Sequence, residues 1–291
     1  MIWLLGRRGM LGRVLEQELS AAQVPYHGSG RECDVTSEES ISANAPNPAP
    51  RWVINCTGYT AVDTAESEVN AAWAVNQRAA AHLAQYCAAH SSRLLHLSTD
   101  YVFDGSESKG YTEAAPIAPQ NVYGASKAAG EQAVRSALAQ HVIIRTAWLH
   151  AEHGRNFVLT VLRLLHERGE LTIVDDQHGS PTYARDLARA IVAIAGSAQP
   201  AYGTFHYTNS GETSWHDFAC QIQDYALELG LSSRRRTIRA ISSAQFPTAA
   251  VRPTYSLLLC EHIAQTYGVE LRPWHQGLRE CMERVAARVT E

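Results

Sequence analysis

The sequence lacks the features that mark membrane, secreted and nucleic-acid-binding proteins. No window reaches the ~18 apolar residues that a membrane-spanning helix needs, and the N-terminal apolar run MIWLL is too short for the core of a signal peptide. Lysine and arginine form no stripe along any expected helix, and the formal net charge is −4. These absences predict a cytoplasmic protein that binds neither membrane nor nucleic acid.

The cysteines are few and scattered along the chain. No two of the six are close enough to form a C-x-x-C metal or redox site. They are Cys33, Cys56, Cys87, Cys220, Cys260 and Cys281. Such a distribution favours reduced thiols in a cytoplasmic protein, although spacing alone leaves disulfides open.

Hydrophobic residues make up 45% of the 291 residues and charged residues 19%, which is enough to build a large buried core. In residues 1–150, short apolar runs alternate with longer amphipathic segments. The runs predict strands at Ile2–Leu5, Val24–His27, Trp52–Asn55, Leu94–Ser98 and Val142–Thr146. The segments predict helices at Met10–Ala22, Ala71–His90 and Val122–Leu138. This alternation is typical of an α/β protein with a parallel sheet that is covered on both faces.

The pattern is less regular after residue 150. Helices are predicted at 156–169, Ala184–Ile194, Ser214–Leu229, Leu257–Thr266 and Pro273–Val289. A strand is predicted in LTIV at 171–174 and another at Thr237–Ile241, and the proline-rich segment 43–50 is expected to be a loop. We expect a smaller C-terminal region that is interleaved with the end of the first sheet.

A glycine-rich loop, GRRGMLG, follows the first predicted strand directly. Gly6, Gly9 and Gly12 are spaced G-x-x-G-x-x-G, and a predicted helix begins at once. Glycines at such a turn let backbone N–H groups and the helix N-terminus approach a phosphate closely. Glycines also serve ordinary tight turns, but the position between a strand and a helix favours nucleotide binding.

The residues after the second predicted strand indicate which dinucleotide is bound. NAD sites usually carry an acid at the end of this strand, where it binds the ribose hydroxyls. Here the sequence is PYHGSGRE, so the first acid, Glu32, comes late and follows Arg31. Arg7 and Arg8 lie in the glycine loop itself. Although these arginines could be ordinary solvated loop residues, the pattern favours NADPH and leaves NADH possible.

A tyrosine and a lysine four residues apart, Tyr123 and Lys127, would lie on one helix face. A lysine cation one turn away is expected to lower the pKa of the tyrosine, which could then act as a proton donor near neutral pH. Thr99, at the end of a predicted strand, could hold a carbonyl oxygen beside it. Because such a pair also occurs by chance, the prediction of a ketone reductase depends on its combination with the glycine loop.

These blocks resemble the extended short-chain dehydrogenases/reductases and, among them, the dTDP-4-dehydrorhamnose reductase family. The resembling segments run through almost the whole chain. They are GRRGMLG, NCTGYTAVDTAE, VN at 75–76, STDYVFDG, YGASKAAGE, RTAWLHAEHGRNFVLTVLRL, VDDQHGSPT, HYTNSGETSWHDFA and RPTYS. The resemblance implies a Rossmann-type doubly wound parallel sheet, with an NAD(P)-binding domain in residues 1–150 and a mainly substrate-binding region in 151–291. Parts of 170–210 would complete the sheet.

The implied activity is NADPH-dependent reduction of the C4 ketone of dTDP-4-dehydro-6-deoxy-L-mannose, which gives dTDP-L-rhamnose. A first alternative is a reductase of another dTDP-4-keto-deoxysugar. A second is a non-catalytic binding protein of the same fold, resembling the regulatory subunit of methionine adenosyltransferase. A tyrosine, lysine and threonine set that is complete in this sequence argues against the second alternative.

The resemblance also assigns roles to individual residues. The catalytic residues would be Thr99, Tyr123 and Lys127, and the sugar would contact Thr99, Asp100, Tyr101 and Trp148. The cofactor would contact Gly6, Arg8, Gly9, Met10, Leu11, Arg31, Asp34, Val35, Cys56, Gly58, Tyr59, Thr60, Tyr123 and Lys127. Purely structural roles remain open for some of them, with Trp148 in the core and Asp34 as a helix cap.

The chain departs from the family at the two positions of a metal site, and also at Cys56 and Gly58, where the family mostly has alanine. Some members hold Mg²⁺ at a dimer interface through glutamates, and the corresponding places are Val14 and Arg185 here. Neither residue offers Mg²⁺ an oxygen ligand. Glu16 and Asp186 lie nearby in the sequence, but Glu16 is expected to point to the opposite side of its helix. We therefore expect no Mg²⁺ and either a monomer or a homodimer.

Overall fold

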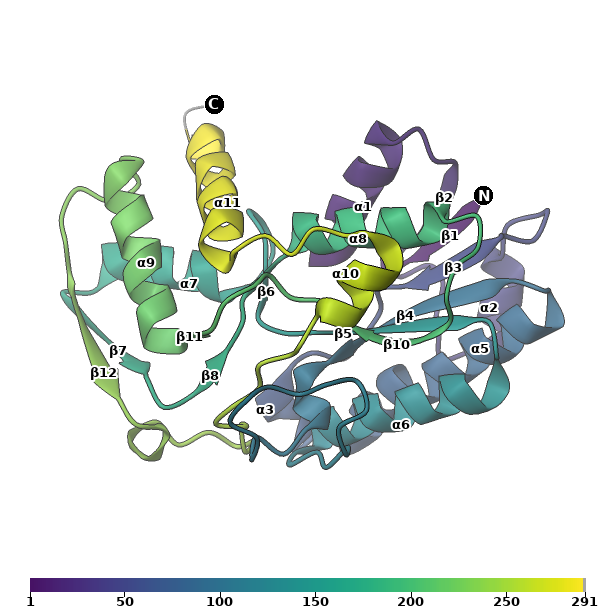
Figure 1. Cartoon of the computed structure of the whole chain (residues 1–291), viewed down its shortest axis with the longest axis horizontal. Coiled ribbons are helices and arrows are strands. Elements are labelled where there is room, and N and C mark those ends of the chain that lie inside the picture. Colours follow the sequence, from purple (N-terminus) through teal and green to yellow (C-terminus); the bar gives the residue numbers. More distant parts are fainter. Residues whose placement is uncertain (290–291) are drawn as a thin grey trace.

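The computed structural model describes residues 1–289 and is built around a six-stranded parallel sheet (Figure 1). Its strand order is β10-β5-β4-β3-β1-β2. The strands are β1 (Ile2–Leu5), β2 (Tyr26–Ser29), β3 (Trp52–Asn55), β4 (Arg93–Thr99), β5 (His141–Thr146) and β10 (Gly203–His206). The chain passes from β1 outward to β2 and then returns to place β3 on the other side of β1. This reversal puts the loops after β1 and β3 side by side, where doubly wound sheets bind their ligands.

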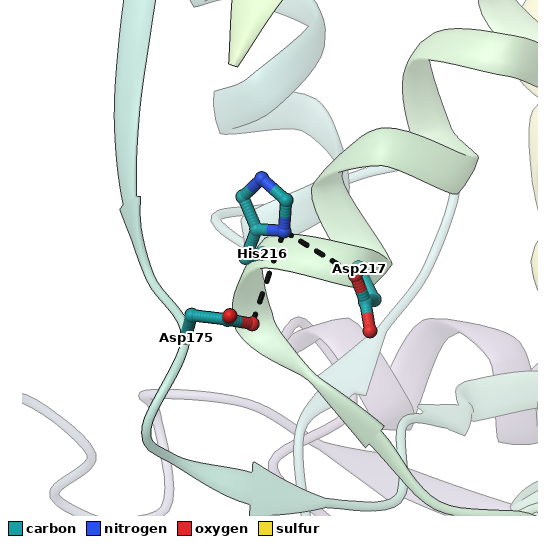
Figure 2. A group of neighbouring side chains, drawn as sticks. All are labelled: Asp175, His216 and Asp217. Carbon is teal, nitrogen blue, oxygen red and sulfur yellow. Dashed lines mark hydrogen bonds and ion pairs between the residues drawn. The ribbon is translucent and has the colours of Figure 1, made fainter. Parts of the chain in front are cut away.

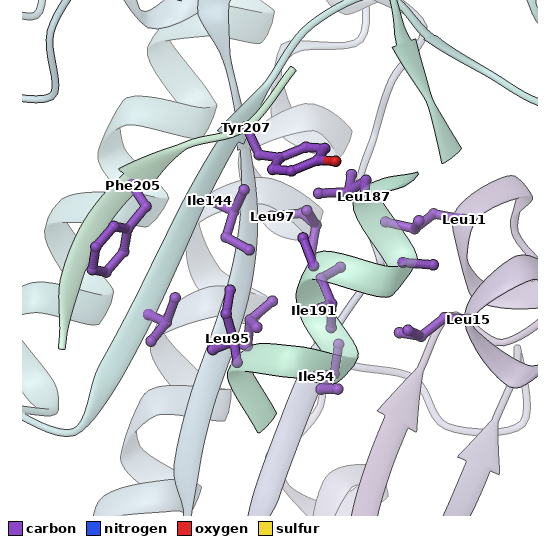
Figure 3. Packing of buried hydrophobic residues seen from close by; sticks show 14 of the residues in the cluster. Leu11, Leu15, Ile54, Leu95, Leu97, Ile144, Leu187, Ile191, Phe205 and Tyr207 are labelled. Atoms are coloured by element: carbon purple, nitrogen blue, oxygen red, sulfur yellow. The ribbon is translucent and has the colours of Figure 1, made fainter. Parts of the chain in front are cut away.

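Helices cover both faces of the sheet (Figure 1). On one face lie α1 (Met10–Ala21) and α8 (Ala184–Gly196), and on the other lie α2 (Glu38–Asn44), α5 (Ala79–Ala89) and α6 (Val122–Ala137). Figure 3 shows the apolar core under the first face. It includes Leu11, Leu15, Ile54, Leu95, Leu97, Ile144, Leu187, Ile191, Phe205 and Tyr207. The predicted α/β class with a doubly wound parallel sheet is therefore confirmed.

The smaller region lies at the left of Figure 1 and has a separate core. It consists of α7 (Phe157–Glu167), β7 (Glu170–Val174), α9 (Trp215–Glu228), β12 (Thr237–Ile241) and α11 (Trp274–Val289). β7 and β12 pair in parallel, and α7, α9 and α11 bury apolar side chains between them. The domain boundary at residue 150 remains a prediction, although β10 belongs to the large sheet.

Most predicted elements are present, with shifted ends. β2 begins two residues later than expected, because Pro25 has no N–H and contributes only its carbonyl, which accepts from the Ile2 amide. The helix expected from Leu257 begins at Glu261 as α10 (Glu261–Tyr267), because Leu257 and Leu259 form backbone hydrogen bonds with Tyr111 instead. The apolar runs did not place strand β10, although it lies within residues 170–210, parts of which were expected to complete the sheet.

Short elements were also missed by the sequence patterns. These are α2, α3 (Val62–Ala65), η2 (Asp100–Val102), β6 (Leu149–His150), β8 (His178–Gly179), β9 (Thr182–Tyr183), β11 (Thr213–Ser214) and η3 (Ser243–Gln245). The helix predicted from Ala71 to His90 divides into α4 (Val69–Trp73), a π-helical segment η1 (Ala74–Arg78) and α5. Within residues 1–289, no helix combines the length and apolar character that crossing a membrane requires.

Candidate active site

Tyr123 and Lys127 lie one turn apart on α6, whose first turn is capped by Asn121. The Asn121 side chain accepts from the Gly124 amide at 2.7 Å. Helix α6 packs tightly against the segment after Thr99 at Gly124, because a Cβ on Gly124 would collide with the carbonyl oxygen of Tyr101. The N-terminal end of α6 is thereby held against the segment that follows Thr99, the last residue of β4.

The structure brings the three proposed catalytic residues together. The Thr99 hydroxyl lies close enough to the Tyr123 phenol to lower the pKa of that phenol. Lys127 Nζ donates to the Leu97 carbonyl at 2.5 Å. Tyr123 and Lys127 of α6 therefore both contact the carboxyl end of β4, where Thr99 lies.

The pKa of Tyr123 differs from the expectation drawn from the sequence. Burial raises it to about 12 and outweighs the opposing effect of the nearby Thr99 hydroxyl, so the phenol is protonated at neutral pH. The ammonium of Lys127 is bound to a backbone carbonyl. Burial lowers its pKa to about 8, with Glu131 opposing the change. A protonated phenol beside a buried cation suits proton donation to a ketone oxygen as that oxygen gains negative charge.

Asp100 and Tyr101 continue directly from Thr99 in η2. Asp100 is 2% exposed and accepts from the Thr99 hydroxyl at 2.9 Å. Burial raises its pKa to about 6, although the nearby hydroxyls of Ser256 and Thr99 act to lower it. The Tyr101 ring meets the Tyr123 ring edge to face, with centroids 5.6 Å apart. Both residues adjoin the proposed catalytic group.

Trp148 lies just after β5 in a conformation that is unusual for a bulky residue, with φ +47. Its indole stacks on Trp215 at a centroid distance of 3.5 Å and an interplanar angle of 10°. It is half-buried and also packs against Gly179, where a Cβ would come within 3.1 Å of the indole. Trp148 thus joins the end of β5 to the smaller region. Its contact with a sugar remains a prediction.

The glycine loop has the tight geometry of a phosphate cradle. Gly6 has φ +79, and a Cβ there would lie 2.9 Å from the backbone of Cys56. A Cβ on Gly12 would collide with the Gly6 carbonyl oxygen. Helix α1 begins at Met10 with Gly9 as its N-cap, so its first amides are not capped by a side chain. These residues fit a dinucleotide phosphate, although the side chain of Leu11 is buried in the core and only its backbone could take part.

The arginines of the loop reach the end of β2. The Arg7 guanidinium donates to the Gly28 carbonyl at 3.4 Å and pairs with Glu16 at 2.9 Å. Arg8 lies over Gly30, where a Cβ would come within 3.2 Å of its side chain.

Glu32 turns back toward this same strand end. Its carboxylate accepts from the Gly30 amide at 2.6 Å, and this bond lowers the pKa of Glu32. Arg31, next to it, is exposed. Cationic and acidic groups therefore meet where a doubly wound sheet binds the adenosine ribose.

The remaining proposed cofactor residues fall into two groups. Asp34 closes a turn by accepting from the Thr36 amide and hydroxyl, while Ser37 caps α2, so Asp34 is not the cap of that helix. Val35 is buried in the second core. The loop that contains Cys56, Gly58, Tyr59 and Thr60 follows β3 and adjoins the glycine loop.

Asn76 belongs to the VN segment at 75–76 that carries the family resemblance, but no role was assigned to it from the sequence. It lies in the π-helical segment, is 1% exposed, and bonds both backbone groups of Tyr59. Its amide also donates to the Ser126 hydroxyl at 2.9 Å. Asn76 therefore ties the cofactor loop to α6. Its position in a π-helical turn is the structural signal that would have identified it, since such turns are frequent at functional sites.

The two places where Mg²⁺-binding glutamates were considered have other roles. Val14 is fully buried in the core. Arg185 forms ion pairs with Glu18, with Glu152 at 3.2 Å and with Glu280 at 4.0 Å. A guanidinium therefore occupies the centre of this acidic group.

The two acids considered as substitutes lie in separate interactions. Glu16 pairs with Arg7 at the glycine loop, whereas Asp186 binds Asn209 and Arg272.

One other group of possible metal ligands is found within residues 1–289. Asp175, His216 and Asp217 lie where β7 meets the start of α9 (Figure 2). His216 Nδ1 is 3.3 Å from Asp217 and 3.8 Å from Asp175, and Ser214 donates to Asp175 at 2.6 Å. Ion pairs and a helix-capping hydroxyl account for this arrangement.

The sheet, the glycine loop and the tyrosine–lysine helix together define the class of protein. The chain is an NAD(P)-dependent oxidoreductase of the extended short-chain dehydrogenase/reductase type. Solved structures of more distant enzymes have the same fold, including DesIV, a dTDP-glucose 4,6-dehydratase from Streptomyces venezuelae, with a TM-score of 0.80 at 16% identity.

The family is narrower than this class. The model of the RmlD substrate binding domain matches residues 1–287, and the chain belongs to this family. The dTDP-4-dehydrorhamnose reductase of Streptomyces griseus is 40% identical over 294 residues, covering 98% of this chain and 94% of that protein. That of Aggregatibacter actinomycetemcomitans is 39% identical over 252 residues, covering 85% and 86% of the two chains.

Solved structures agree with this assignment. The dTDP-4-dehydrorhamnose reductase of Bacillus anthracis, in complex with NADP, has a TM-score of 0.89 and 34% identity. The match covers 97% of this chain and 98% of that one. The resemblance read from the sequence is therefore confirmed.

Proposed function

We propose that this chain reduces the C4 ketone of dTDP-4-dehydro-6-deoxy-L-mannose with NADPH, giving dTDP-L-rhamnose. One observation carries the proposal: Tyr123, Lys127 and Thr99 converge at the carboxyl end of β4, on the ligand-binding edge of the sheet. Relatives named dTDP-4-dehydrorhamnose reductase, and the one solved with NADP, support the substrate and the cofactor.

The glycine cradle and the bare N-terminus of α1 fit the cofactor's phosphates, and Arg8 and Arg31 would hold a 2′-phosphate. When bound, NADPH supplies the hydride that C4 receives. Side chains of the protein bind and protonate the ketone oxygen. The hydroxyls of Thr99 and Tyr123 hold the ketone oxygen, and Tyr123 gives it a proton as C4 accepts the hydride pair.

Lys127 stabilises the phenolate that remains after this proton transfer, because it is a cation in the same buried setting. Solvent then returns a proton to Tyr123. Asp100 and Tyr101 would contact the sugar hydroxyls beside the reacting ketone, and Trp148 would pack against the deoxyhexose. These residue roles, together with the cofactor contacts of Asp34, Val35 and the loop after β3, are part of the proposal.

A second candidate is reduction of a different dTDP-4-keto-deoxysugar. The dTDP-4-keto-6-deoxy-D-glucose reductase of Streptomyces niveus is 38% identical over 282 residues, covering 96% of each chain. This similarity is close to that of the dTDP-4-dehydrorhamnose reductases. The two substrates share the nucleotide and the C4 ketone and differ in the stereochemistry of the sugar ring, so discrimination depends on the sugar contacts.

Separate assays with the two ketosugars test the proposal. Purified protein is given NADPH and either dTDP-4-dehydro-6-deoxy-L-mannose or dTDP-4-keto-6-deoxy-D-glucose, and the loss of NADPH is followed. We expect kcat/KM to favour the L-manno sugar by at least about tenfold, a margin that sugar contacts can supply. Preference for the D-gluco sugar would establish the second candidate, and no turnover of either would reject both. Cytoplasmic location and a monomeric or homodimeric state remain proposals.

A further inference from the structure

A buried acid on the tyrosine–lysine helix has no role in the chemistry described above. Glu131 lies one turn beyond Lys127 on α6 and is 0% exposed. Tyr123, Lys127 and Glu131 are spaced four residues apart, so they form one stripe along the helix. All three face the carboxyl end of β4.

The stripe contacts three consecutive residues of that strand. Lys127 binds the carbonyl of Leu97, Glu131 accepts from the hydroxyl of Ser98 at 2.5 Å, and Tyr123 meets the hydroxyl of Thr99. The position of α6 along β4 is therefore fixed by Lys127 and Glu131, which both follow the proton donor on the helix.

Arg145 of β5 holds the other side of Glu131. Its Nε and Nη2 donate to the two carboxylate oxygens at 2.9 and 2.7 Å, and Arg135 adds a contact at 3.1 Å. Arg145 is 2% exposed, and its guanidinium also lies 3.3 Å from His206 of β10. Although burial raises the pKa of Glu131, the bonds from Arg145 outweigh it and keep this pKa below its usual range.

We propose that Glu131 is a positioning residue for the reduction: it sets α6 against the end of β4 and places a carboxylate one turn from Lys127. This inference rests on the proposed function, because it concerns the same reaction. A buried carboxylate whose partners lie on two strands and its own helix fixes their relative position more firmly than apolar packing does. Displacement of a reacting group by ~1 Å can cost ~10²-fold in rate.

The charge around Lys127 depends on Glu131. The titratable groups near it are Tyr123 and Glu131 on α6, His96 on β4, Asp100 on η2, Arg145 on β5 and Cys56 after β3. Burial holds the pKa of His96 well below its usual range and raises that of Cys56 to about 12, so both are neutral at neutral pH. Among charged neighbours, Glu131 acts most strongly to raise the pKa of Lys127.

Glu131→Gln tests the inference, with Glu152→Gln as the matched control. Glu152 is also buried and also paired with an arginine, Arg185, but this partner belongs to α8, which covers the opposite face of the sheet from α6. In Glu131→Gln we expect kcat to fall ~10–100-fold, with each KM changed by less than about threefold. The alkaline limb of the kcat profile should also move down by about one pH unit. Glu152→Gln should leave both kcat and this limb unchanged.

Ser98→Ala keeps the inference testable if Glu131→Gln does not fold. It removes one hydrogen bond to Glu131 and leaves the charge, so we expect a several-fold loss of kcat with no shift of the alkaline limb. A folded Glu131→Gln enzyme with unchanged kcat and pH profile would overturn the inference. So would equal losses in Glu152→Gln, or a Ser98→Ala variant identical to the wild type.

A spectroscopic reading separates this inference from the proposed function. The chain has two lysines, Lys109 and Lys127, so protein labelled with carbon-13 at lysine Cε gives two titrating signals. Exposed Lys109 is the internal reference. We expect the pKa of Lys127 to fall in Glu131→Gln and stay constant in Glu152→Gln, whatever the substrate. If the wild type reduces no dTDP-ketosugar, the proposed function fails but this pKa change still decides the charge role of Glu131.

Discussion

Two buried glutamate–arginine pairs lie on opposite sides of the sheet. Glu131 and Arg145 join α6 to β4 and β5, directly beside Lys127. Arg185 of α8 and Glu152 join α8 to the start of the smaller region, and Glu18 of α1 and Glu280 of α11 complete that cluster. Both pairs are buried, yet only the first has a tyrosine and a lysine in the same stripe.

The difference shows that a buried ion pair does not by itself indicate chemistry. Each pair fixes the positions of the elements that it joins, because removing one partner leaves a charge in a poorly solvated place. Whether a pair affects activity or only stability depends on the residues that the joined elements contain. At the first pair they carry a proton donor and a cation, whereas at the second they carry apolar core residues and further salt bridges.

The largest effect is expected at the first pair's helix. Tyr123→Phe removes only the hydroxyl, so we expect a loss of ~10²–10⁴ in kcat with dinucleotide binding retained. Steady-state assays and fluorescence titration with NADPH check the two halves of this statement. If the variant keeps a near-normal kcat, Tyr123 is not the proton donor. The Glu131–Arg145 pair would then adjoin no catalytic tyrosine and would not differ in this respect from the Glu152–Arg185 pair.

The second pair should respond in stability instead of rate. Arg185→Ala leaves Glu18, Glu152 and Glu280 without their central cation, and we expect a loss of ~3–5 kcal/mol in the free energy of unfolding. The kcat per folded molecule should not change. Arg189→Ala is the control, because this half-exposed arginine shares Glu18 and Glu280 and should cost under about 1 kcal/mol. Equal losses in both variants would contradict a central role for Arg185.

Asp100 is a buried acid near Tyr123 that, unlike the glutamates of the two ion pairs, has no arginine partner within residues 1–289, and its effect on stability should depend on pH. Its pKa rises from an ordinary value of 3.8 to about 6 in the folded state, so the neutral carboxyl favours folding below about pH 4 and this contribution is lost as the pH rises through 6. Asp100→Asn removes the ionisation. The free energy of unfolding of the variant minus that of the wild type should therefore be about 2–3 kcal/mol larger at pH 8 than at pH 4. The variant thus gains stability relative to the wild type as the pH rises. Denaturant titrations at both values test this, and a pH-independent difference would be inconsistent with it.

The arginines at the end of β2 should produce a smaller change, confined to cofactor choice. If Arg8 and Arg31 hold a 2′-phosphate, replacing both with alanine should reduce the NADPH-to-NADH ratio of kcat/KM by about tenfold. The rate with NADH should stay close to that of the wild type. A wild-type preference for NADH that the double variant leaves unaltered would show that Glu32, not the arginines, decides the choice.

The smallest expected effect is that of metal removal. Arg185 occupies the centre of the acidic cluster, and a guanidinium offers Mg²⁺ no ligand. Rates measured with EDTA and with added Mg²⁺ should therefore agree. Inactivation by EDTA that added Mg²⁺ reverses would mean that the cation requirement lies elsewhere in the chain.

The sequence predicted the parts of the fold that depend on local pattern. Strand β3 occurs where its apolar run predicted it, and the strand–glycine–helix order placed the cradle at Gly6 and Gly9. The convergence of Thr99 with Tyr123 follows from the same logic, because a residue at the end of a parallel strand meets the helix that packs on it. Motif resemblance then supplied the family.

What sequence patterns missed depends on partners that are distant in the chain. Strand β10 reads GTFH and is a strand only because β5 pairs with it. The high pKa of Tyr123 comes from burial, which spacing to a lysine does not reveal. The role of Asn76 depends on its position in a π-helical turn. The role of Arg185 depends on carboxylates from three other segments of the chain.

The central claim is that the group around Tyr123 directs a hydride to C4 and a proton to its oxygen. NADPH deuterated at the transferred position, mixed with dTDP-4-dehydro-6-deoxy-L-mannose and the wild-type protein, tests this most directly. We expect NMR of the product to show dTDP-L-rhamnose with deuterium at C4, and Tyr123→Phe to yield almost none. Absence of NADPH consumption, or deuterium at another carbon, would contradict the account.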